Sequence, residues 1–372
     1  MRPGSRVLAP AAAMRGARPT DRAQATYVSG CTAMKERDLP AALDFLNDAE
    51  RLGFDPDSCA AGRWQGYMLL GRFKEAWQES AAIEKRGAVD PHRLWDGRPF
   101  SNRRLIVRCL HGQGDAIHFI RYASLLKQQA SKVIVECPRR LMPLLSRVSG
   151  VDEVCTWEAQ PFAPSDWEHQ IEVVELPRAF RTTLDSIPAL VPYIHLDRSM
   201  QRSGILEERR RVGVVWASGA WNRSRSIPIS ALVPMFQLPG FRFYALQGGA
   251  EALDLNSLPV DCVVHDVTGE SEDLLRAAEL IIQFDLILTV DTMTAHLAGA
   301  LGKPVWLMLS FAADWRWMTE RSDSPWYPSM RIFRQPQPGR WDCVVDQVCQ
   351  ALRKWDQTSC SKGANSAATL PM

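Results

Sequence analysis

Polar residues follow an apolar run near residue 290, in the arrangement that phosphate-binding sites use. The run 286–290 has the length and composition of a buried strand, and Asp291 and Thr292 follow it directly. A helix pattern rich in small residues comes next, ends at Gly302, and leads into a second apolar run, 305–309. Open α/β sheets bind ligands where strands end and helices begin, and the free N–H groups of a helix start attract phosphate. The junction predicts a site for a nucleotide or another phosphorylated ligand.

A second polar junction follows the predicted strand 105–110. Gly112 and Gly114 permit a tight turn and a close approach of a ligand to the backbone, and Asp115 stands at the head of the next helix. Asp115 also has a simpler explanation as a capping residue, because aspartate is among the residues preferred there. The third glycine of the dinucleotide fingerprint is missing, which disfavours an epimerase or dehydrogenase of Rossmann type.

A basic loop near residue 220 offers further groups that bind phosphate. Ser218 can donate a hydrogen bond to a phosphate oxygen, and Arg223 and Arg225 can neutralise a diphosphate through forked hydrogen bonds. The alternative explanation is a solvated basic loop. His296 lies four residues after Thr292, on the same face of the predicted helix, where a single histidine is more often a core or capping residue than a catalyst.

No metal site is expected from the sequence. The triplet Asp55-Pro56-Asp57 resembles a D-x-D metal motif, but it lies in a turn between predicted helices. Aromatic residues crowd the region after residue 300, where sugar stacking is one use and core packing is the favoured one. These residues are Trp306, Trp315, Trp317, Trp326 and Trp341.

Composition excludes several classes of protein. The 372 residues carry 44 basic and 42 acidic side chains, and this near balance argues against a broad nucleic-acid face. No apolar run approaches the roughly 20 residues that span a bilayer, so no transmembrane segment is expected. Nine cysteines without a C-x-x-C pair favour free thiols in a reducing cytosol. The expected location is cytoplasmic, with peripheral association at the inner membrane as the alternative.

The ends of the chain and its first third differ from the rest. Residues 1–24 are basic and predict a disordered leader, and the Ser-, Ala- and Thr-rich residues 357–372 predict a disordered tail. Residues 25–90 have helical patterns. The segment beginning at Asp38 aligns with that beginning at Arg72, an offset (72 − 38) of 34 residues, which is the tetratricopeptide (TPR) period. A repeat of this kind needs a neighbour to bury its apolar face, so it packs on the following domain or on a partner protein. The alternative is an unrelated helical hairpin.

Strands and helices alternate from residue 104 onward, which predicts α/β architecture with parallel sheets. We expect two doubly wound Rossmann-like domains of similar size, 91–200 and 205–356, with a cleft between them and a linker helix or hinge at 197–211. Predicted helices cover 116–129, 141–148, 230–236 and 272–283. Predicted strands cover 105–110, 132–137, 151–157, 171–176 and 190–196, then 212–216, 241–246, 261–265, 286–290 and 305–309.

Taken together, these motifs resemble bacterial TPR proteins whose C-terminal part is a glycosyltransferase family nine (heptosyltransferase-like) module of GT-B architecture. The resemblance covers roughly 91–355. It is carried by GQGDAIHFIRY (112–122), VGVVWASG (212–219), Arg225-Ser226-Ile227, Leu246-Gln247, VDTMTAHLAGALGKPVW (290–306), DWRW (314–317) and SPWYP (324–328).

The resemblance implies a role for individual residues. The Gly-Asp pair of heptosyltransferases carries the proposed catalytic base, which corresponds to Asp115 next to Gly114. The Asp-Thr-x-x-x-His block implies that backbone N–H groups of Thr292, Met293 and Thr294 hold the sugar-nucleotide diphosphate. Two departures are Met293, where heptosyltransferases usually have a small residue, and His118, where related repeat proteins often have Gln. The remaining residues expected at the donor are Gly114, Ser218, Arg223, Arg225, Gln247, Asp291 and His296.

The resulting expectation is an inverting, metal-independent glycosyltransferase without a cofactor. It would move a sugar from a nucleotide-sugar donor to a hydroxyl group of a glycan, lipid-linked or protein acceptor. The alternative is a catalytically degenerate GT-B/TPR scaffold or a nucleotide-binding interaction protein, with the helical repeats recruiting a protein.

Overall fold

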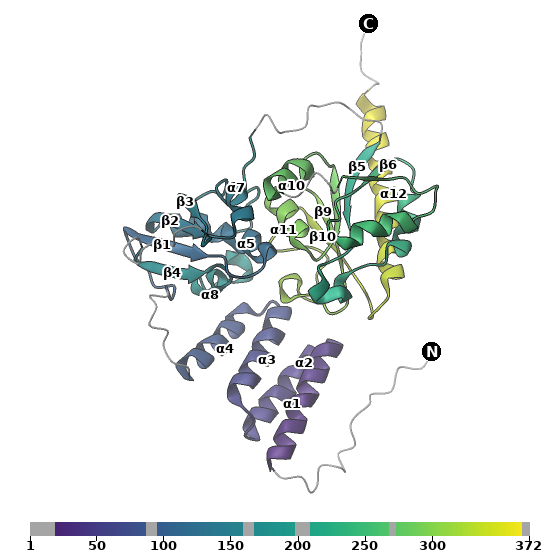
Figure 1. Cartoon of the computed structure of the whole chain (residues 1–372). Helices are drawn as coiled ribbons and strands as arrows, with labels where there is room; N and C mark the ends of the chain where they lie inside the picture. The colour runs from purple at the N-terminus through teal and green to yellow at the C-terminus, as the bar shows by residue number, and fades with distance from the viewer. Residues whose placement is uncertain (1–18, 87–94, 159–166, 198–208, 268–272, 367–372) are drawn as a thin grey trace. The chain divides into compact units, whose positions relative to one another are not determined.

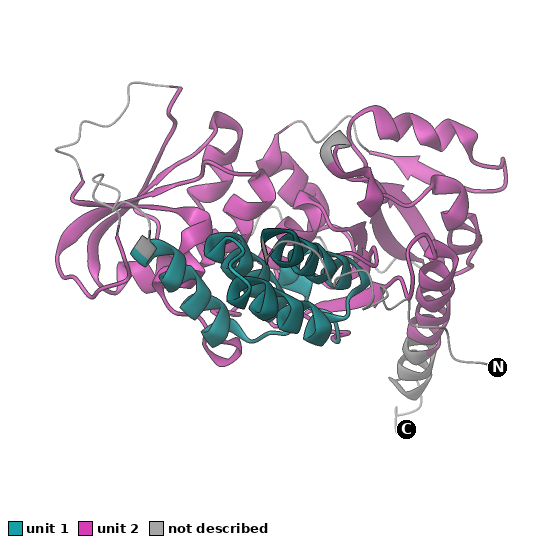
Figure 2. Ribbon diagram, turned by 90° about the horizontal axis from the view of Figure 1, so that it is seen from below, with its two compact units in different colours: residues 1–89, 314–320 teal, residues 90–313, 321–372 magenta. Residues whose placement is uncertain are grey.

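The computed structural model describes residues 19–86, 95–158, 167–197, 209–267 and 273–366 (Figure 1). It divides the chain into two compact units (Figure 2). Unit 1 contains residues 1–89 together with 314–320, and unit 2 contains 90–313 and 321–372. A short segment of the C-terminal half therefore belongs to the same compact unit as the N-terminal helices. Most of the predicted linker, and the first and last residues of the chain, lie outside the described residues.

The described N-terminal residues of unit 1 form the helices α1 (Pro19–Glu36), α2 (Leu39–Arg51), α3 (Pro56–Leu69) and α4 (Phe73–Arg86). Capping explains two of the starts, because the Asp38 and Asp55 carboxylates accept hydrogen bonds from the N–H groups of the third helical residues. The predicted helical segment is confirmed, and α2 and α4 begin at the two aligned repeat positions. The predicted leader is wrong at residues 19–24, where Ala23 packs in the core as part of α1.

Buried charge and aromatic packing hold unit 1 together. Arg63 on α3 forms ion pairs at 2.6 Å with Glu50 on α2 and at 2.8 Å with Glu79 on α4. Trp315, from the segment 314–320, makes edge-to-face contacts with Trp64 and Phe73 at ring distances of 5.8 and 6.3 Å. One charged network and one aromatic cluster thus tie the helices of this unit.

The first sheet of unit 2 has four parallel strands in the order β3-β2-β1-β4. The strands are β1 (Arg103–Arg108), β2 (Ala130–Glu136), β3 (Glu153–Cys155) and β4 (His169–Glu172). The predicted strand 190–196 is wrong. Pro192 has no N–H to donate to a ladder, and the Tyr193 N–H bonds to the Ala300 carbonyl instead, at 3.1 Å. Only an isolated bridge at Ile194 remains there.

Short helices follow three of these strands: α5 (Gln113–Phe119) and α6 (Ala123–Lys127) after β1, α7 (Met142–Leu145) after β2, and α8 (Leu176–Ala179) after β4. The helix predicted over 116–129 is interrupted by a tight 3-10 turn at Ile120–Tyr122. Arg121 explains the interruption, because its Nε donates to the His118 carbonyl at 2.7 Å. That carbonyl is the acceptor that a continued α-helix would offer to the Tyr122 N–H.

The second sheet has six parallel strands in the order β10-β9-β8-β5-β6-β7. They are β5 (Arg210–Val215), β6 (Phe241–Ala245), β7 (Val264–Asp266), β8 (Leu286–Val290), β9 (Val305–Leu309) and β10 (Met330–Arg334). Numbered along the chain, this is the doubly wound order 3-2-1-4-5-6, and the first sheet repeats its first four positions. The two sheets therefore differ in size, in contrast to the prediction, which lacked β10.

Helices α9 (Val233–Phe236) and α12 (Trp341–Ser366) pack on each other, as do α10 (Leu274–Ile281) and α11 (Met293–Ala300). The tail prediction is wrong up to Ser366, because α12 continues through Gln357. Trp355 anchors this part of the helix by packing on the core of the sheet, and a helix with a packed start extends at little cost. Core packing is confirmed for Trp317, Trp326 and Trp341, which are at most 7% exposed.

Candidate functional site

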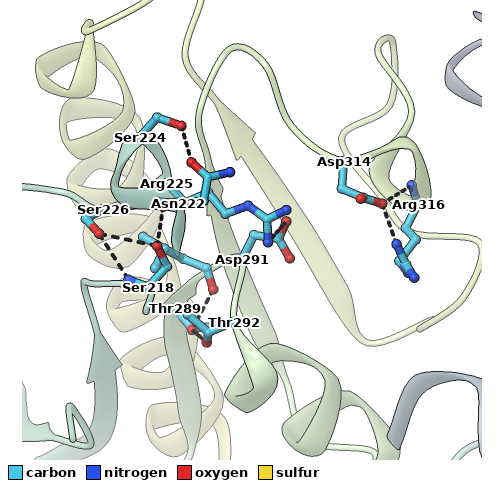
Figure 3. Close-up of polar contacts among 11 residues, drawn as sticks. Ser218, Asn222, Ser224, Arg225, Ser226, Thr289, Asp291, Thr292, Asp314 and Arg316 are labelled. Atoms are coloured by element: carbon cyan, nitrogen blue, oxygen red, sulfur yellow. Dashed lines mark hydrogen bonds and ion pairs between the residues drawn. The ribbon is translucent and has the colours of Figure 1, made fainter. Parts of the chain in front are cut away.

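The candidate site lies at the carboxyl ends of β5 and β8, which are neighbours at the centre of the second sheet. The strand order reverses there, and ligands of open α/β sheets bind at this position. The basic loop follows β5, and Asp291 and Thr292 follow β8. Arg225 Nη1 in this loop lies 3.2 Å from Asp291 Oδ2 (Figure 3). The structure therefore brings the two sequence motifs into direct contact.

Helix α11 begins at the end of β8 without a side-chain cap. Thr292 is the N-cap residue, with extended backbone angles of −139° and 173°, and its side chain caps no N–H group. Its hydroxyl oxygen instead lies 3.1 Å from the hydroxyl oxygen of Thr289 (Figure 3). The side chain of Thr292 therefore does not take the place of an anion at the N–H groups of Met293 and Thr294, both on partly buried residues.

Hydrogen bonds within the loop after β5 use several of its polar groups. The Ser218 hydroxyl donates to the Asn222 carbonyl at 2.6 Å, and the Ser218 N–H donates to the Ser226 hydroxyl at 3.0 Å (Figure 3). Ser218 is only 5% exposed. Its observed role is to shape the loop, whereas Arg223 is exposed to solvent.

Gln247 also has a structural role in this arrangement. Its amide oxygen accepts hydrogen bonds from the N–H groups of Trp216 at 3.2 Å and Ala217 at 2.8 Å. Its amide nitrogen donates to the Gly248 carbonyl at 2.9 Å. The side chain is 5% exposed and holds the end of β5, from which the basic loop starts.

The other predicted junction, at the start of α5, lies against the start of α11. Gly112 is the N-cap of α5. A carboxylate oxygen of Asp115 lies close to it, 3.2 Å from the position that a Cβ on Gly112 would take. A Cβ on Gly114 would lie 3.1 Å from His296 Cδ2 and 3.5 Å from Met293 Cα. Gly114 thus permits close contact between the two helix starts. The position of this carboxylate also agrees with the simpler explanation of Asp115, in which the side chain stabilises the start of α5.

His296 does not point into open solvent. It is 5% exposed, and its Nδ1 lies 3.0 Å from the hydroxyl oxygen of Tyr327. The same hydroxyl lies 2.9 Å from Nδ1 of His118, which is fully buried on α5. Sequence reasoning missed this link. Tyr327 lay within a quoted motif, but no pattern indicated which helices its hydroxyl would join.

A second group that sequence reasoning missed lies at the carboxyl edge of the first sheet. His111 follows β1, and its Nδ1 lies 2.9 Å from Glu172 Oε1 at the end of β4. Glu172 also accepts hydrogen bonds from the N–H groups of Leu110 and Val174. The hydrogen bond with Glu172 raises the pKa of His111, with smaller contributions from the charges of Glu172 and Asp115. The available signal was a histidine directly after a strand, next to the Gly-Asp motif.

Metal-ligating groups and membrane-spanning helices are both absent from the part of the chain that the structure describes. Within the described ranges, no group of three or more His, Cys, Asp or Glu side chains could hold a metal ion. None of the helices in the same ranges combines the length and the apolar character that crossing a bilayer requires.

Comparisons with known proteins give distant similarities. No family model matches the chain. Protein FlbA of Caulobacter vibrioides is 27% identical over 353 residues, which cover 85% of this chain and 59% of FlbA. The chain thus spans less than two thirds of the length of this curated relative.

Two solved structures resemble the fold over about 70% of the chain. ADP-heptose LPS heptosyltransferase II of E. coli is 15% identical, covers 69% of this chain and 99% of its own, and has a TM-score of 0.49. The glycosyl transferase family 9 protein of Veillonella parvula is 10% identical, covers 70% of this chain and 99% of its own, and also has a TM-score of 0.49. At these values, the function of the chain has to be argued from its own residues.

Proposed function

We propose that the chain is an inverting glycosyltransferase of GT-B architecture that uses a nucleotide-sugar donor. The observation that carries the proposal is the contact between the starts of α5 and α11 at Gly114, His296 and Met293. It brings a carboxylate-bearing junction and an anion-binding junction together from two different parallel sheets. Transfer of a glycosyl group needs these two kinds of group close to one reacting carbon.

In this proposal the donor binds at the second sheet. The N–H groups of Met293 and Thr294 bind the diphosphate, and the exposed guanidinium of Arg223 adds positive charge. Arg225 contributes less, because Asp291 already pairs with it. Fixed donors of this kind stabilise the leaving diphosphate as its charge develops, so no metal ion is required for that role.

Asp115 is the proposed base. The acceptor hydroxyl transfers its proton to the carboxylate, and the acceptor oxygen forms a bond to the anomeric carbon. The bond from that carbon to the donor phosphate oxygen breaks, and the nucleoside diphosphate leaves with the electron pair. General-base assistance of this kind is typically worth about 10² to 10⁴ in rate. The acceptor hydroxyl belongs to a glycan, a lipid-linked glycan or a protein, and the helices of unit 1 are proposed as TPR-like repeats that recruit a protein.

Calorimetry with ADP, GDP and UDP, followed by donor-hydrolysis and transfer assays, tests the proposal. We expect one diphosphate to bind, and Asp115→Asn to lower turnover about 10²-fold or more while the diphosphate still binds. Asp185→Asn is a matched control, because Asp185 is an exposed aspartate in a different turn of the same unit. Absence of binding by all three diphosphates would exclude the enzyme. Binding with an unchanged rate in Asp115→Asn would exclude Asp115 as the base.

A second candidate function is a nucleotide-binding interaction protein without turnover. It is favoured by the internal use of polar groups at the site: Ser218 and Gln247 hold the backbone, and Asp291 pairs with Arg225. Diphosphate binding without donor hydrolysis or transfer would support this candidate over the enzyme.

A further inference from the structure

The hydroxyl of Tyr327 joins the two helices that carry the candidate catalytic and donor-binding groups. Its oxygen lies 2.9 Å from His118 Nδ1 on α5 and 3.0 Å from His296 Nδ1 on α11. His118 lies three residues after Asp115, and His296 lies three residues after Met293. Each histidine therefore lies about one turn further along its helix than Asp115 or Met293. The hydroxyl spans the two helices just behind their functional ends.

Both hydrogen bonds need the hydroxyl. Each imidazole Nδ1 either donates its proton to the tyrosine oxygen or accepts the proton of the tyrosine O–H, and a ring without the hydroxyl can do neither. Burial raises the pKa of Tyr327 well above its ordinary value, so the hydroxyl keeps the proton that it donates. A phenylalanine at this position would lose both bonds and keep the ring.

Packing fixes the ring of Tyr327 on α11. A Cβ on Gly299 would lie 2.4 Å from Tyr327 Cδ1, so the ring occupies the space that the glycine leaves on the helix. Loss of the hydroxyl would therefore leave the ring on α11 and remove its hydrogen bond to His118 on α5. The bond to His118 is the part of the link that reaches across to the other sheet.

Arg121 supports the α5 side of this link. The fully buried guanidinium donates to the carbonyls of His118 and Trp326, and to the Tyr193 hydroxyl at 3.2 Å. It also lies 4.3 Å from the centre of the Tyr327 ring, within the range of a cation–π interaction. Because Trp326 precedes Tyr327, Arg121 ties the end of α5 to the segment that carries the bridging hydroxyl.

We propose that Tyr327 is a positioning residue that, through His118 and His296, sets the placement of the Asp115 carboxylate relative to the N–H groups of Met293 and Thr294. The inference rests on the proposed glycosyl transfer. Tyr327 is buried and acts through the two histidines rather than on substrate. A reacting group displaced by about 1 Å loses on the order of 10² in rate. Donor binding depends on the start of α11 alone and is retained.

The first test is Tyr327→Phe. We expect kcat to fall about tenfold to a hundredfold, with the KM for the donor and the Kd for nucleoside diphosphate within about twofold of the wild-type values. Tyr122→Phe is the matched control. The Tyr122 hydroxyl also makes a buried bond, at 2.7 Å, but its partner is Thr182, which does not belong to α11. Its loss should lower the melting temperature and leave kcat unchanged.

A second pair of variants tests the bond to His118 without changing Tyr327. In His118→Asn the side-chain amide can replace Nδ1, and we expect kcat within about threefold of wild type. Leucine has no group that could replace Nδ1, so in His118→Leu we expect kcat to fall as much as in Tyr327→Phe. The double variant of Tyr327→Phe and His118→Leu should lose no more than either single change, because both remove the same link.

The outcomes separate this inference from the proposed function. An active wild type with an unchanged kcat in Tyr327→Phe would overturn the positioning role alone. An equal loss of kcat in Tyr122→Phe would also overturn it, because the effect would then be general destabilisation. If Tyr327→Phe does not fold, equal rates for His118→Asn and His118→Leu would likewise overturn the positioning role. A wild type without turnover on any donor would contradict the proposed function itself, and the positioning role with it.

Discussion

Arg225 Nη1 lies 3.2 Å from Asp291 Oδ2, and this ion pair joins the loop after β5 to the end of β8. Both side chains are mostly shielded from water, with 18% and 7% of their surface exposed. A shielded guanidinium that is already paired with a carboxylate has less charge to offer an incoming anion. Asp291 therefore controls how much positive charge Arg225 presents at the start of α11.

Asp291→Asn should have opposite effects on stability and on anion binding. Removal of one partner from a shielded ion pair leaves the other without its counter-charge, so we expect a loss of about 3 kcal/mol in the free energy of unfolding, measured by denaturant titration. The released guanidinium should strengthen ADP binding roughly tenfold in calorimetry, a change of about 1.4 kcal/mol. Weaker ADP binding would mean that Asp291 supports the ligand rather than competing with it.

Gly114→Ala should disturb the contact between α5 and α11. The new Cβ would lie 3.1 Å from His296 Cδ2, so the His296 ring would have to shift by a few tenths of an ångström in its buried position. Overpacking of this kind costs about 1–3 kcal/mol of stability, and turnover should fall as well. Gly248→Ala is the control, because a Cβ there would meet nothing within 4 Å. Equal melting temperatures and rates for the two variants would show that the contact is loose.

Arg63→Ala should destabilise unit 1 strongly. The Arg63 side chain is 9% exposed and pairs with Glu50 and Glu79, so its removal leaves carboxylates partly buried without their counter-charge. The expected cost is about 3–5 kcal/mol, measured as loss of helical signal in denaturant. Arg51→Ala is the control, because the pair of Arg51 with Asp48 is exposed and should contribute about 0–1 kcal/mol. Similar midpoints for the two variants would contradict the structural role of Arg63.

The pair of His111 and Glu172 predicts a pH dependence. The hydrogen bond from His111 to Glu172 raises the pKa of His111 above 6.5, its ordinary value. A group whose folded pKa is raised stabilises the fold below its unfolded pKa, and this contribution disappears as the pH rises through the folded pKa. The pair should thus stabilise the protein most in mildly acidic solution and not at alkaline pH.

Glu172→Gln tests this pH dependence. The amide oxygen can still accept the hydrogen bond, but the negative charge is gone, so the pKa of His111 should fall. Imidazole NMR titration measures that pKa directly. The difference in stability between wild type and variant should shrink as the pH rises above neutrality. An unchanged His111 titration would show that the ion pair does not form in solution.

Local patterns in the sequence predicted most of the elements and the strand–helix junctions on which the candidate site is proposed. The strand–helix–strand unit of β8, α11 and β9 was predicted within a few residues, because its apolar runs are continuous and its helix start is abrupt. The junction at Gly112 was also identified, as its glycines and aspartate are local signals. The strand expected over 190–196 failed for a tertiary reason, since the Tyr193 N–H bonds to Ala300, far away in the sequence.

The sequence by itself determined most of the strands and helices, where polar groups follow strands, and that positive charge and a carboxylate are available there. Only the tertiary structure decided which of these groups form contacts with one another. It pairs Arg225 with Asp291, uses Ser218 and Gln247 within the backbone scaffold, and places Tyr327 between His118 and His296. Contacts of this kind join residues up to 209 positions apart. They depend on how two sheets and their helices pack in three dimensions, and no periodicity along one chain encodes that packing.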